Sequence, residues 1–376
     1  MKYVQINAYS GGWADSIIFK KHRELQEEGH ESWVFWARGN HDQDCYMQKY
    51  VSNAEVWLDA LLTRADGRVS FHSKGATRRL LSRLDEISPD VVHLHVLLGY
   101  YINVEMLFGW LEAHRCEVVW TLHDCWAFTG HCYHFSYVGC EQWRDGCARC
   151  ESCPQVHEYP ETYFGGRKSV RWSYEQKKRL FTLLPSNRLR LIAPSQWLAD
   201  LVKQSYLSKY DISIERNVVD DSIYRPVKSN FKETHGLANK FMVLGVASKW
   251  SERKGLSDLV RLSSELDSKR FAVVVVGLSG KQIKQVKAVA PEAIALSRTD
   301  SLAELVEIYS AADVLFNPTL EDNYPTVNLE AQACGTPVVT YDTGGCVETL
   351  SLPDSSTVSG FEEAVEVISD LQVSRN

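Results

Sequence analysis

Short apolar segments with the character of buried strands alternate with helical segments through almost the whole chain of 376 residues. The clearest of them, Phe271–Val276, is an unbroken apolar run that ends at Gly277 and is typical of a central strand in a parallel sheet. Parallel strands are joined by helical crossovers, so the alternation indicates doubly wound sheets. Because the chain is too long for one core of ordinary size, we predict an α/β protein of two Rossmann-like domains that face each other across a cleft.

Apolar periodicity is lost between Asp220 and Lys232, and we place the domain boundary there. The predicted N-terminal domain comprises residues 1–222, and the predicted C-terminal domain comprises residues 223–376. Residues 129–161 are rich in Gly, Cys, His and aromatic residues and have no clear period. Since long loops of this kind are usually functional or stapled, we interpret them as a Cys-rich insertion into the α/β pattern.

The composition is that of a globular protein, with 44% hydrophobic and 24% charged residues. A formal net charge of −7 argues against nucleic acid as a partner. No apolar run is long enough to span a bilayer, and the strand-like start MKYVQINAYSGG does not resemble a signal peptide. We therefore expect a cytoplasmic protein, whose membrane contact, if it has one, is at the inner face of the cell membrane.

A local excess of positive charge lies between residues 64 and 83. Its six basic residues are Arg64, Arg68, Lys74, Arg78, Arg79 and Arg83. A helix face exposed to solvent explains these residues and is the favoured interpretation. The alternative is peripheral membrane contact through residues 64–83, or contact with a pyrophosphate-linked acceptor, because anionic headgroups and phosphates attract such a segment.

Five of the ten cysteines crowd into the insertion: Cys132, Cys140, Cys147, Cys150 and Cys153. In a long chain from a reducing compartment, such a cluster indicates free thiols or a metal site before disulfides. Cys150 and Cys153 have the C-x2-C spacing of half a zinc site, and four of the five could form a tetrahedral thiolate set. His131 and His134 are further candidate ligands. We expect free buried thiols first and a structural zinc second.

Two strand-like segments of the first half carry polar residues at their carboxyl ends, where parallel sheets bind ligands. One ends in His93-Leu94-His95 and the other in His123-Asp124. The pair Gly11-Gly12 follows the first strand, and glycine lets a ligand approach the backbone closely. The fingerprint G-x-G-x-x-G is absent from the sequence, which removes the main support for a nicotinamide or flavin cofactor.

In the second half, the stretch from Phe316 to Gly345 is predicted to form a strand, a loop, a helix and a second strand. Asn323 is the candidate N-cap of this helix, and Pro325 stands near its first position. The N–H groups at such a helix start are where α/β proteins hold phosphate. Asp322 precedes the helix and Glu330 lies inside it. Taken alone, the two acids could equally be solvated residues of an ordinary βαβ unit.

Several motifs that occur in order resemble those of the retaining glycosyltransferases of family 4, which have the GT-B fold. The matching residues of the second half are Lys249, Lys254 and Gly255, then Asp322 and Glu330 eight residues apart, then A-x2-C-G-T-P-V-V from Ala331, and then Gly344-Gly345. Those of the first half are Gly11-Gly12, the residues TLHD at 121–124, APS at 193–195, and Asn217. The run TLHDCWAFTGHC is similar to the subset that builds bacterial exopolysaccharide or capsule repeats. The resemblance covers nearly the whole chain, and it implies that residues 1–222 are the acceptor-binding domain and residues 223–376 the nucleotide-sugar-binding domain.

The resemblance implies a metal-independent reaction that needs no cofactor. A hexose from a UDP- or GDP-linked donor would pass, with retention of configuration, to a glycan or to a polyprenyl-diphosphate-linked saccharide in polysaccharide biosynthesis. Lys249 and Lys254 would offset the diphosphate charge, and Glu330 would accept hydrogen bonds from the ribose. The implied catalytic residues are His123, Lys254 and Asp322. The implied donor-binding residues are Gly11, Gly12, Lys249, Lys254, Asn323, Tyr324, Thr326, Val327 and Glu330.

Three positions depart from the pattern of the family. Asp322 replaces a glutamate and is one methylene shorter, and Lys249 replaces an arginine and loses bidentate phosphate geometry. Pro325 has no N–H where relatives often have a glycine, so that contact passes to Tyr324, Thr326 or Val327. The alternatives are a nucleotide-sugar epimerase of the same fold and an inactive donor-binding partner subunit.

Overall fold

The computed structural model describes residues 1–11, 15–164 and 166–374. The chain divides into two compact units, Met1–Arg216 and Asn217–Asn376. This division precedes the predicted boundary after residue 222. Asn217 belongs to the second unit, where its side-chain amide donates to the carbonyl oxygen of Tyr324 at 3.5 Å.

The first unit has a seven-stranded, wholly parallel sheet in the order β3-β2-β1-β4-β5-β6-β7. Its strands are β1 (Lys2–Tyr9), β2 (Glu31–Arg38), β3 (Met47–Lys49), β4 (Val91–Leu94), β5 (Glu117–Thr121), β6 (Leu189–Ala193) and β7 (Ile212–Ile214). The strand order reverses between β1 and β4, which is where doubly wound sheets bind ligands.

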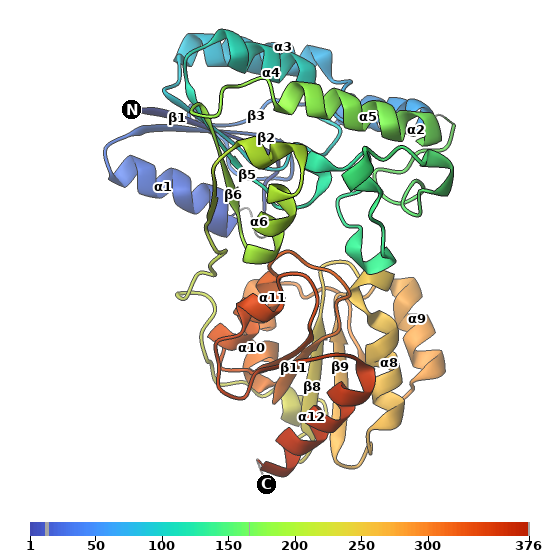
Figure 1. The fold of residues 1–376 in the computed structure, drawn as a ribbon. Coiled ribbons are helices and arrows are strands. Elements are labelled where there is room, and N and C mark those ends of the chain that lie inside the picture. The colour runs from blue at the N-terminus through green and yellow to red at the C-terminus, as the bar shows by residue number, and fades with distance from the viewer. Residues whose placement is uncertain (12–14, 165, 375–376) are drawn as a thin grey trace. The chain divides into compact units, whose positions relative to one another are not determined.

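Helices cover both faces of this sheet, and Figure 1 shows α1 on the side opposite to α3 and α4. They are α1 (Lys20–Glu27), α2 (Asn53–Asp66), α3 (Lys74–Ile87), α4 (Val104–Ala113), α5 (Gly166–Phe181) and α6 (Gln196–Lys203). Ser195 is the N-cap of α6, because its hydroxyl accepts from the N–H of Leu198 at 3.2 Å. A π-helical turn, Asp15–Phe19, leads into α1.

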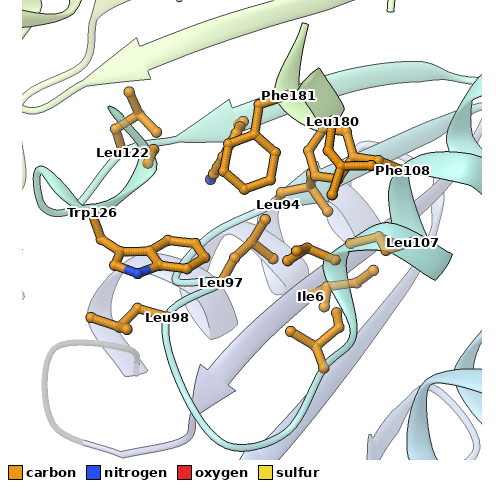
Figure 2. Packing of buried hydrophobic residues seen from close by; sticks show 14 of the residues in the cluster. Ile6, Leu94, Leu97, Leu98, Leu107, Phe108, Leu122, Trp126, Leu180 and Phe181 are labelled. Atoms are coloured by element: carbon orange, nitrogen blue, oxygen red, sulfur yellow. The ribbon is translucent and has the colours of Figure 1, made fainter. Parts of the chain in front are cut away.

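The core of the first unit lies between the sheet and α4 and α5. Figure 2 shows Ile6 of β1 and Leu94 of β4 beside Phe108 of α4 and Phe181 of α5. The two phenylalanine rings lie 4.7 Å apart, and Trp126 packs 6.0 Å from Phe181. The predicted insertion, residues 129–161, therefore begins next to a well-packed core.

Within its described residues the insertion has short turns of 3-10 helix and no strand: Ser136–Val138, Gln142–Asp145 and Cys150–Ser152. A further turn, Trp126–Phe128, precedes it. Aromatic side chains pack together in this segment. The rings of Phe128 and Phe135 both lie 5.4 Å from the buried ring of Trp143. The insertion thus has a small core of its own.

The second unit has a six-stranded parallel sheet in the order β10-β9-β8-β11-β12-β13. Its strands are β8 (Phe241–Val246), β9 (Phe271–Val276), β10 (Ile294–Ala295), β11 (Val314–Asn317), β12 (Val338–Tyr341) and β13 (Ser356–Val358). Its helices are α7 (Phe231–Thr234), α8 (Leu256–Glu265), α9 (Gly280–Val289), α10 (Leu302–Ala311), α11 (Thr326–Ala333) and α12 (Phe361–Ser374).

Side chains of β8 alternate between two cores, because successive residues of a strand point to opposite faces. Val243 packs with Leu259 of α8, whereas Leu244 packs with Tyr309 of α10. Figure 1 accordingly shows α8 and α9 on the side of the sheet opposite to α10 and α11. The prediction of two doubly wound α/β domains is confirmed.

Residues 64–83 form parts of two helices rather than one helical face, because α2 ends at Asp66 and α3 begins at Lys74. Several of their basic side chains have acidic partners. Arg64 lies 3.3 Å from Glu161, and Arg79 lies 2.7 Å from Glu55. No helix of the described chain is long and apolar enough to cross a bilayer.

Candidate functional site

Basic and acidic side chains converge at the carboxyl edge of the second sheet, in the loops that follow β8 and β11. The Lys254 ammonium donates to Oδ2 of Asp322 at 2.5 Å. The guanidinium of Arg253 lies 3.8 Å from the same oxygen and donates to the carbonyl of Glu321. The side chains of Lys254 and Asp322 are only 21% and 18% exposed, so the ion pair is largely shielded from water. Arg253 was not among the predicted site residues.

Two glycines hold the loop of Asp322 in place from either side. Gly255 has φ +71, and a Cβ there would stand 2.1 Å from the carbonyl oxygen of Pro318. Gly344 has φ +57, and a Cβ there would stand 2.1 Å from the carbonyl oxygen of Asp322. L-residues rarely adopt either conformation, and no side chain fits either space. The chain can therefore close around the ion pair only with glycine at both positions.

Backbone hydrogen bonds join the two loops further. The N–H of Leu320 donates to the carbonyl of Arg253 at 2.7 Å, and the N–H of Gly345 donates to that of Asp322 at 2.8 Å. The Thr319 hydroxyl also donates to the Arg253 carbonyl, at 3.3 Å. These bonds fix the backbone from which the side chains of Lys254 and Asp322 project.

The helix that follows, α11, begins two residues later than predicted. Its N-cap residue is Pro325, with no side-chain cap, so the expected N-cap role of Asn323 is wrong. The pyrrolidine ring sets φ at −65, and the residue stays extended with ψ 116. By helix geometry the N–H groups of Thr326 and Val327 have no carbonyl to bond within the helix. They are donors for an anion at this helix start.

Glu330 lies further along α11 and faces α10. The buried Tyr309 hydroxyl donates to its Oε2 at 2.8 Å. Burial raises the pKa of Glu330, while hydrogen bonds from Tyr309 and Thr326 act in the opposite direction. The carboxyl group is therefore held in one orientation, which suits an acceptor of hydroxyl hydrogen bonds.

A buried polar network beneath α11 was missed by sequence reasoning. The Asn317 amide donates to Asn328 at 2.8 Å, and Asn328 donates to Thr349 at 2.9 Å. The Gln332 amide donates to the carbonyls of Asn328 and Thr349, each at 2.8 Å. The sequence did contain a signal for this network, because Asn328 and Gln332 are four residues apart and therefore lie on one face of the helix. The network ties α11 to residues 346–352.

The other predicted donor-binding residues lie around the same loops. Tyr324 is buried, and its hydroxyl donates to the carbonyl of Glu348 at 3.3 Å. Lys249 is exposed. The neighbouring Trp250 anchors its loop through an indole N–H that donates to Val276 at 2.8 Å. Of the predicted basic pair, the structure therefore brings only Lys254 to Asp322.

In the first unit, three histidines gather at the ends of β4 and β5. The His93 and His95 rings stack at 4.1 Å, and His95 and His123 stack at 5.6 Å. Nδ1 of His95 lies 3.3 Å from Nε2 of His123, and His93 lies 2.8 Å from the Thr121 hydroxyl. Burial lowers the pKa of His93 to about 3 and that of His123 to about 4, so both rings are neutral at pH 7.

The tautomers of His95 and His123 follow from Gln5. The Gln5 amide nitrogen donates to the carbonyl of Ile18 at 3.2 Å, so its oxygen faces Nε2 of His95 at 3.3 Å. Nε2 of His95 then carries the proton, and its Nδ1 is the acceptor. Nε2 of His123 must therefore be the donor to that atom. Gln5 therefore determines the tautomers of both histidines.

Gly11 follows β1 with φ +103, and a Cβ there would come no closer than 3.6 Å to another residue, Tyr9. Its backbone conformation, rather than close packing, requires glycine. Gly12 lies outside the described residues. Asn7, which was not predicted, joins the ends of two strands, because its amide donates to Tyr9 at 2.6 Å and accepts from the N–H of Val96 at 3.2 Å.

The structure divides the five cysteines of the insertion. Cys132, Cys140, Cys147 and Cys153 line one cavity of about 10 Å³. The Cys150 thiol instead donates to the carbonyl of Cys147 at 3.4 Å. Burial raises the pKa of Cys147 to about 12. Among residues 1–11, 15–164 and 166–374, no three His, Cys, Asp or Glu side chains are arranged to hold a metal ion. The zinc site therefore stays a prediction.

Two family models match the chain. "Glycosyltransferase Family 4" matches residues 18–222, and "Glycosyl transferases group 1" matches residues 239–367. The first covers more than half of the chain. Between them the models span both units.

The chain is also similar to proteins that are named as glycosyltransferases. The chain is 24% identical to the putative colanic acid biosynthesis glycosyl transferase WcaC of Escherichia coli, over 98% of this chain and 89% of that protein. It is 34% identical to a D-inositol 3-phosphate glycosyltransferase of Corynebacterium jeikeium, over 29% of each chain.

Solved structures of glycosyltransferases share the fold. Sucrose-phosphate synthase of Thermosynechococcus elongatus aligns with TM-score 0.66 and 12% identity, over 99% of this chain and 90% of that one. Anabaena HepE in complex with UDP-glucose aligns with TM-score 0.63 and 15% identity, over 98% and 89%. At these identities the likeness concerns the fold, which is GT-B. With the match over residues 18–222, the chain belongs to glycosyltransferase family 4.

Proposed function

We propose that the protein is a retaining, metal-independent hexosyltransferase of polysaccharide biosynthesis. Its donor would be a UDP- or GDP-linked sugar, and its acceptor a glycan or a polyprenyl-diphosphate-linked saccharide. The observation that carries the proposal is the convergence of Lys254 and Arg253 on Asp322, beside the start of α11. It supplies two cations and helix N–H groups within one set of loops, as a diphosphate requires.

The ion pair gives the donor diphosphate a defined entry step. Before binding, Asp322 neutralises the Lys254 ammonium. A diphosphate carries more charge than a carboxylate and would replace Asp322 as the partner of Lys254. Asp322 would then be released to accept a hydrogen bond from a hydroxyl of the donor sugar. This exchange reconciles the phosphate role of Lys254 with the sugar role of Asp322.

Chemistry at the anomeric carbon would depend on leaving-group stabilisation. Lys254, Arg253 and the N–H groups of Thr326 and Val327 would bind the charge that develops on the departing diphosphate, which takes the place of a metal ion. The acceptor hydroxyl would attack from the face that the diphosphate leaves. No pair of carboxylates across the sugar is then required, in contrast to glycosidases. Neutral His123 would contact the sugar as a hydrogen-bonding group.

The names of relatives guide the choice of substrates. A UDP-glucose complex is known for HepE, and WcaC is assigned to colanic acid biosynthesis. UDP-glucose is therefore the first donor to test, and a lipid-linked saccharide the first acceptor. Glu330, fixed by Tyr309, would accept from the ribose hydroxyls that uridine and guanosine donors share.

A thermal-shift screen of UDP, GDP and their sugars tests donor binding. A ligand at a hundred times its dissociation constant stabilises by about 2.7 kcal/mol. We expect the shift to disappear in Lys254→Met and to persist in Lys240→Met, a control at another lysine of the same unit. No shift with any nucleotide would refute the donor site.

Turnover with acceptor, followed by NMR of the product, tests the reaction itself. We expect retained anomeric configuration and full activity in the presence of a chelator. Inversion or loss of activity would refute the corresponding part of the proposal. Epimerised sugar from the donor alone would identify an epimerase. Unchanged polysaccharide in cells that carry Lys254→Met and Glu330→Ala would identify an inactive partner subunit.

A further inference from the structure

The polarity of helix α2 is inverted. After Asn53, its exposed positions are spaced as one face of a helix and are all apolar: Ala54, Trp57, Leu58, Leu61, Leu62 and Ala65. Its buried positions include Asp59 and Thr63. Trp57 is 73% exposed and Leu61 is 65% exposed. A surface helix of a globular protein ordinarily has the opposite arrangement.

Hydrogen bonds hold α2 in this orientation. The Thr63 hydroxyl donates to Asp59 at 3.1 Å, and the Ser73 hydroxyl donates to the other oxygen of the same carboxylate. At the helix start, Ser52 and Glu55 form a capping box. Glu55 also binds Arg79 of α3 at 2.7 Å. Rotation of α2 to bury its leucines would break the bonds from Ser73 to Asp59 and from Arg79 to Glu55, so these two bonds fix the outward apolar face.

Two aromatic residues lie beside the end of this helix. The N–H of Tyr163 donates to the carbonyl of Arg64 at 2.9 Å, and Phe164 follows with 91% of its surface exposed. We define the α2 face as Trp57, Leu58, Leu61, Leu62, Tyr163 and Phe164. Contiguous exposed apolar residues of this number mark an interaction surface rather than chance exposure.

The two chain segments that adjoin the α2 face are rich in basic residues. Residues 64–83 carry a net charge of five, and residues 163–172 carry three more from Arg167, Lys168 and Arg171, whereas the whole chain carries −7. Four acidic partners from outside these segments reduce the excess to four: Glu55, Glu86, Glu161 and Glu175. An apolar face with a basic border matches the charge of an anionic lipid surface.

We infer that the α2 face inserts into the interfacial region of a bilayer that contains anionic lipids. Tryptophan, tyrosine and leucine suit that depth, and the basic border would contact headgroups. A second copy of the chain fits less well, because a two-fold contact through the α2 face would bring two basic borders together. The further link, delivery of a lipid-linked acceptor to the transferase, rests on the proposed function. The membrane contact itself does not.

Co-sedimentation with vesicles tests the inference. Wild type is compared on phosphatidylcholine vesicles with and without about 30% phosphatidylglycerol. The double variant Leu58→Glu/Leu61→Glu replaces two exposed leucines of the α2 face with negatively charged side chains. The control is Val289→Glu at the end of α9, which is also 65% exposed. We expect binding of wild type and control to the anionic vesicles, and binding at least about tenfold weaker in the double variant.

Quenching by brominated lipids provides a readout that does not depend on a charged variant. Wild type should lose more tryptophan fluorescence than Trp57→Leu, since Trp57 would lie among the acyl chains. Absence of wild-type binding, equal binding by the double variant, or equal quenching in Trp57→Leu would overturn the inference. So would a wild-type dimer in sedimentation velocity that the double variant dissolves. Nucleotide-induced thermal shifts of the same proteins report separately on the donor site.

Discussion

Replacement of Gly255 by alanine should destabilise the second unit and displace Lys254. Gly255 has φ +71, which costs an L-residue about 1–2 kcal/mol. The new Cβ would stand 2.1 Å from the Pro318 carbonyl oxygen, so the two loops must separate. Separation removes the 2.7 Å hydrogen bond from Leu320 to Arg253, worth about 1 kcal/mol. Together these effects reduce the free energy of unfolding by about 2–3 kcal/mol.

The measurement is thermal unfolding of Gly255→Ala beside a matched glycine variant. For a unit of 160 residues, this loss lowers Tm by roughly 4–12 °C. The control is Gly280→Ala in the first turn of α9, where a Cβ would meet nothing within 4 Å. Because alanine favours helix, the control should keep or slightly raise Tm.

Donor affinity supplies a second, independent readout. Calorimetry with UDP-glucose, well below both melting temperatures, should give a Kd about tenfold higher in Gly255→Ala, since the loss of one charge-assisted hydrogen bond costs at least about 1.5 kcal/mol. Gly280→Ala should bind as wild type does. A melting temperature of Gly255→Ala equal to that of the control would refute the reasoning about loop closure.

Three further outcomes are expected. Glu330→Gln should weaken UDP-glucose binding about tenfold in calorimetry without loss of Tm, because it removes a buried charge but keeps the shape; unchanged affinity would contradict the ribose role. Burial holds the pKa of His123 at about 4, below its unfolded value, so the unfolded state binds more protons and stability falls as pH drops below about 6.5. In denaturant titrations at pH 4, His123→Gln should lose up to about 3 kcal/mol less stability than wild type loses. The same dependence of stability on pH in both proteins would argue against this role of His123. Protein purified without chelator should give ten thiols per denatured chain and no stoichiometric zinc; one zinc per chain would instead identify the four cavity cysteines as its ligands.

Local sequence patterns were sufficient to predict the fold. The apolar run Phe271–Val276 is an inner strand of the second sheet and has the predicted bounds. Such features depend on residues within a few positions of one another, so they can be predicted from short stretches of sequence. The same reasoning placed Asp322 and Glu330 at the carboxyl edge of a parallel sheet, which the order of strand, loop and helix already requires.

Contacts between distant residues decided the rest. Lys254 and Asp322 are 68 positions apart, and only the meeting of two loops shows that Arg253, rather than exposed Lys249, accompanies them. Tertiary packing likewise selected Pro325 as the N-cap of α11 and turned the leucines of α2 outward around Asp59. The sequence by itself determined the two sheets and the motifs at their edges. The tertiary structure alone decided which cations pair with Asp322, which tautomers the histidines adopt and which face of α2 is exposed. These features depend on free energies of desolvation and hydrogen bonding between remote segments.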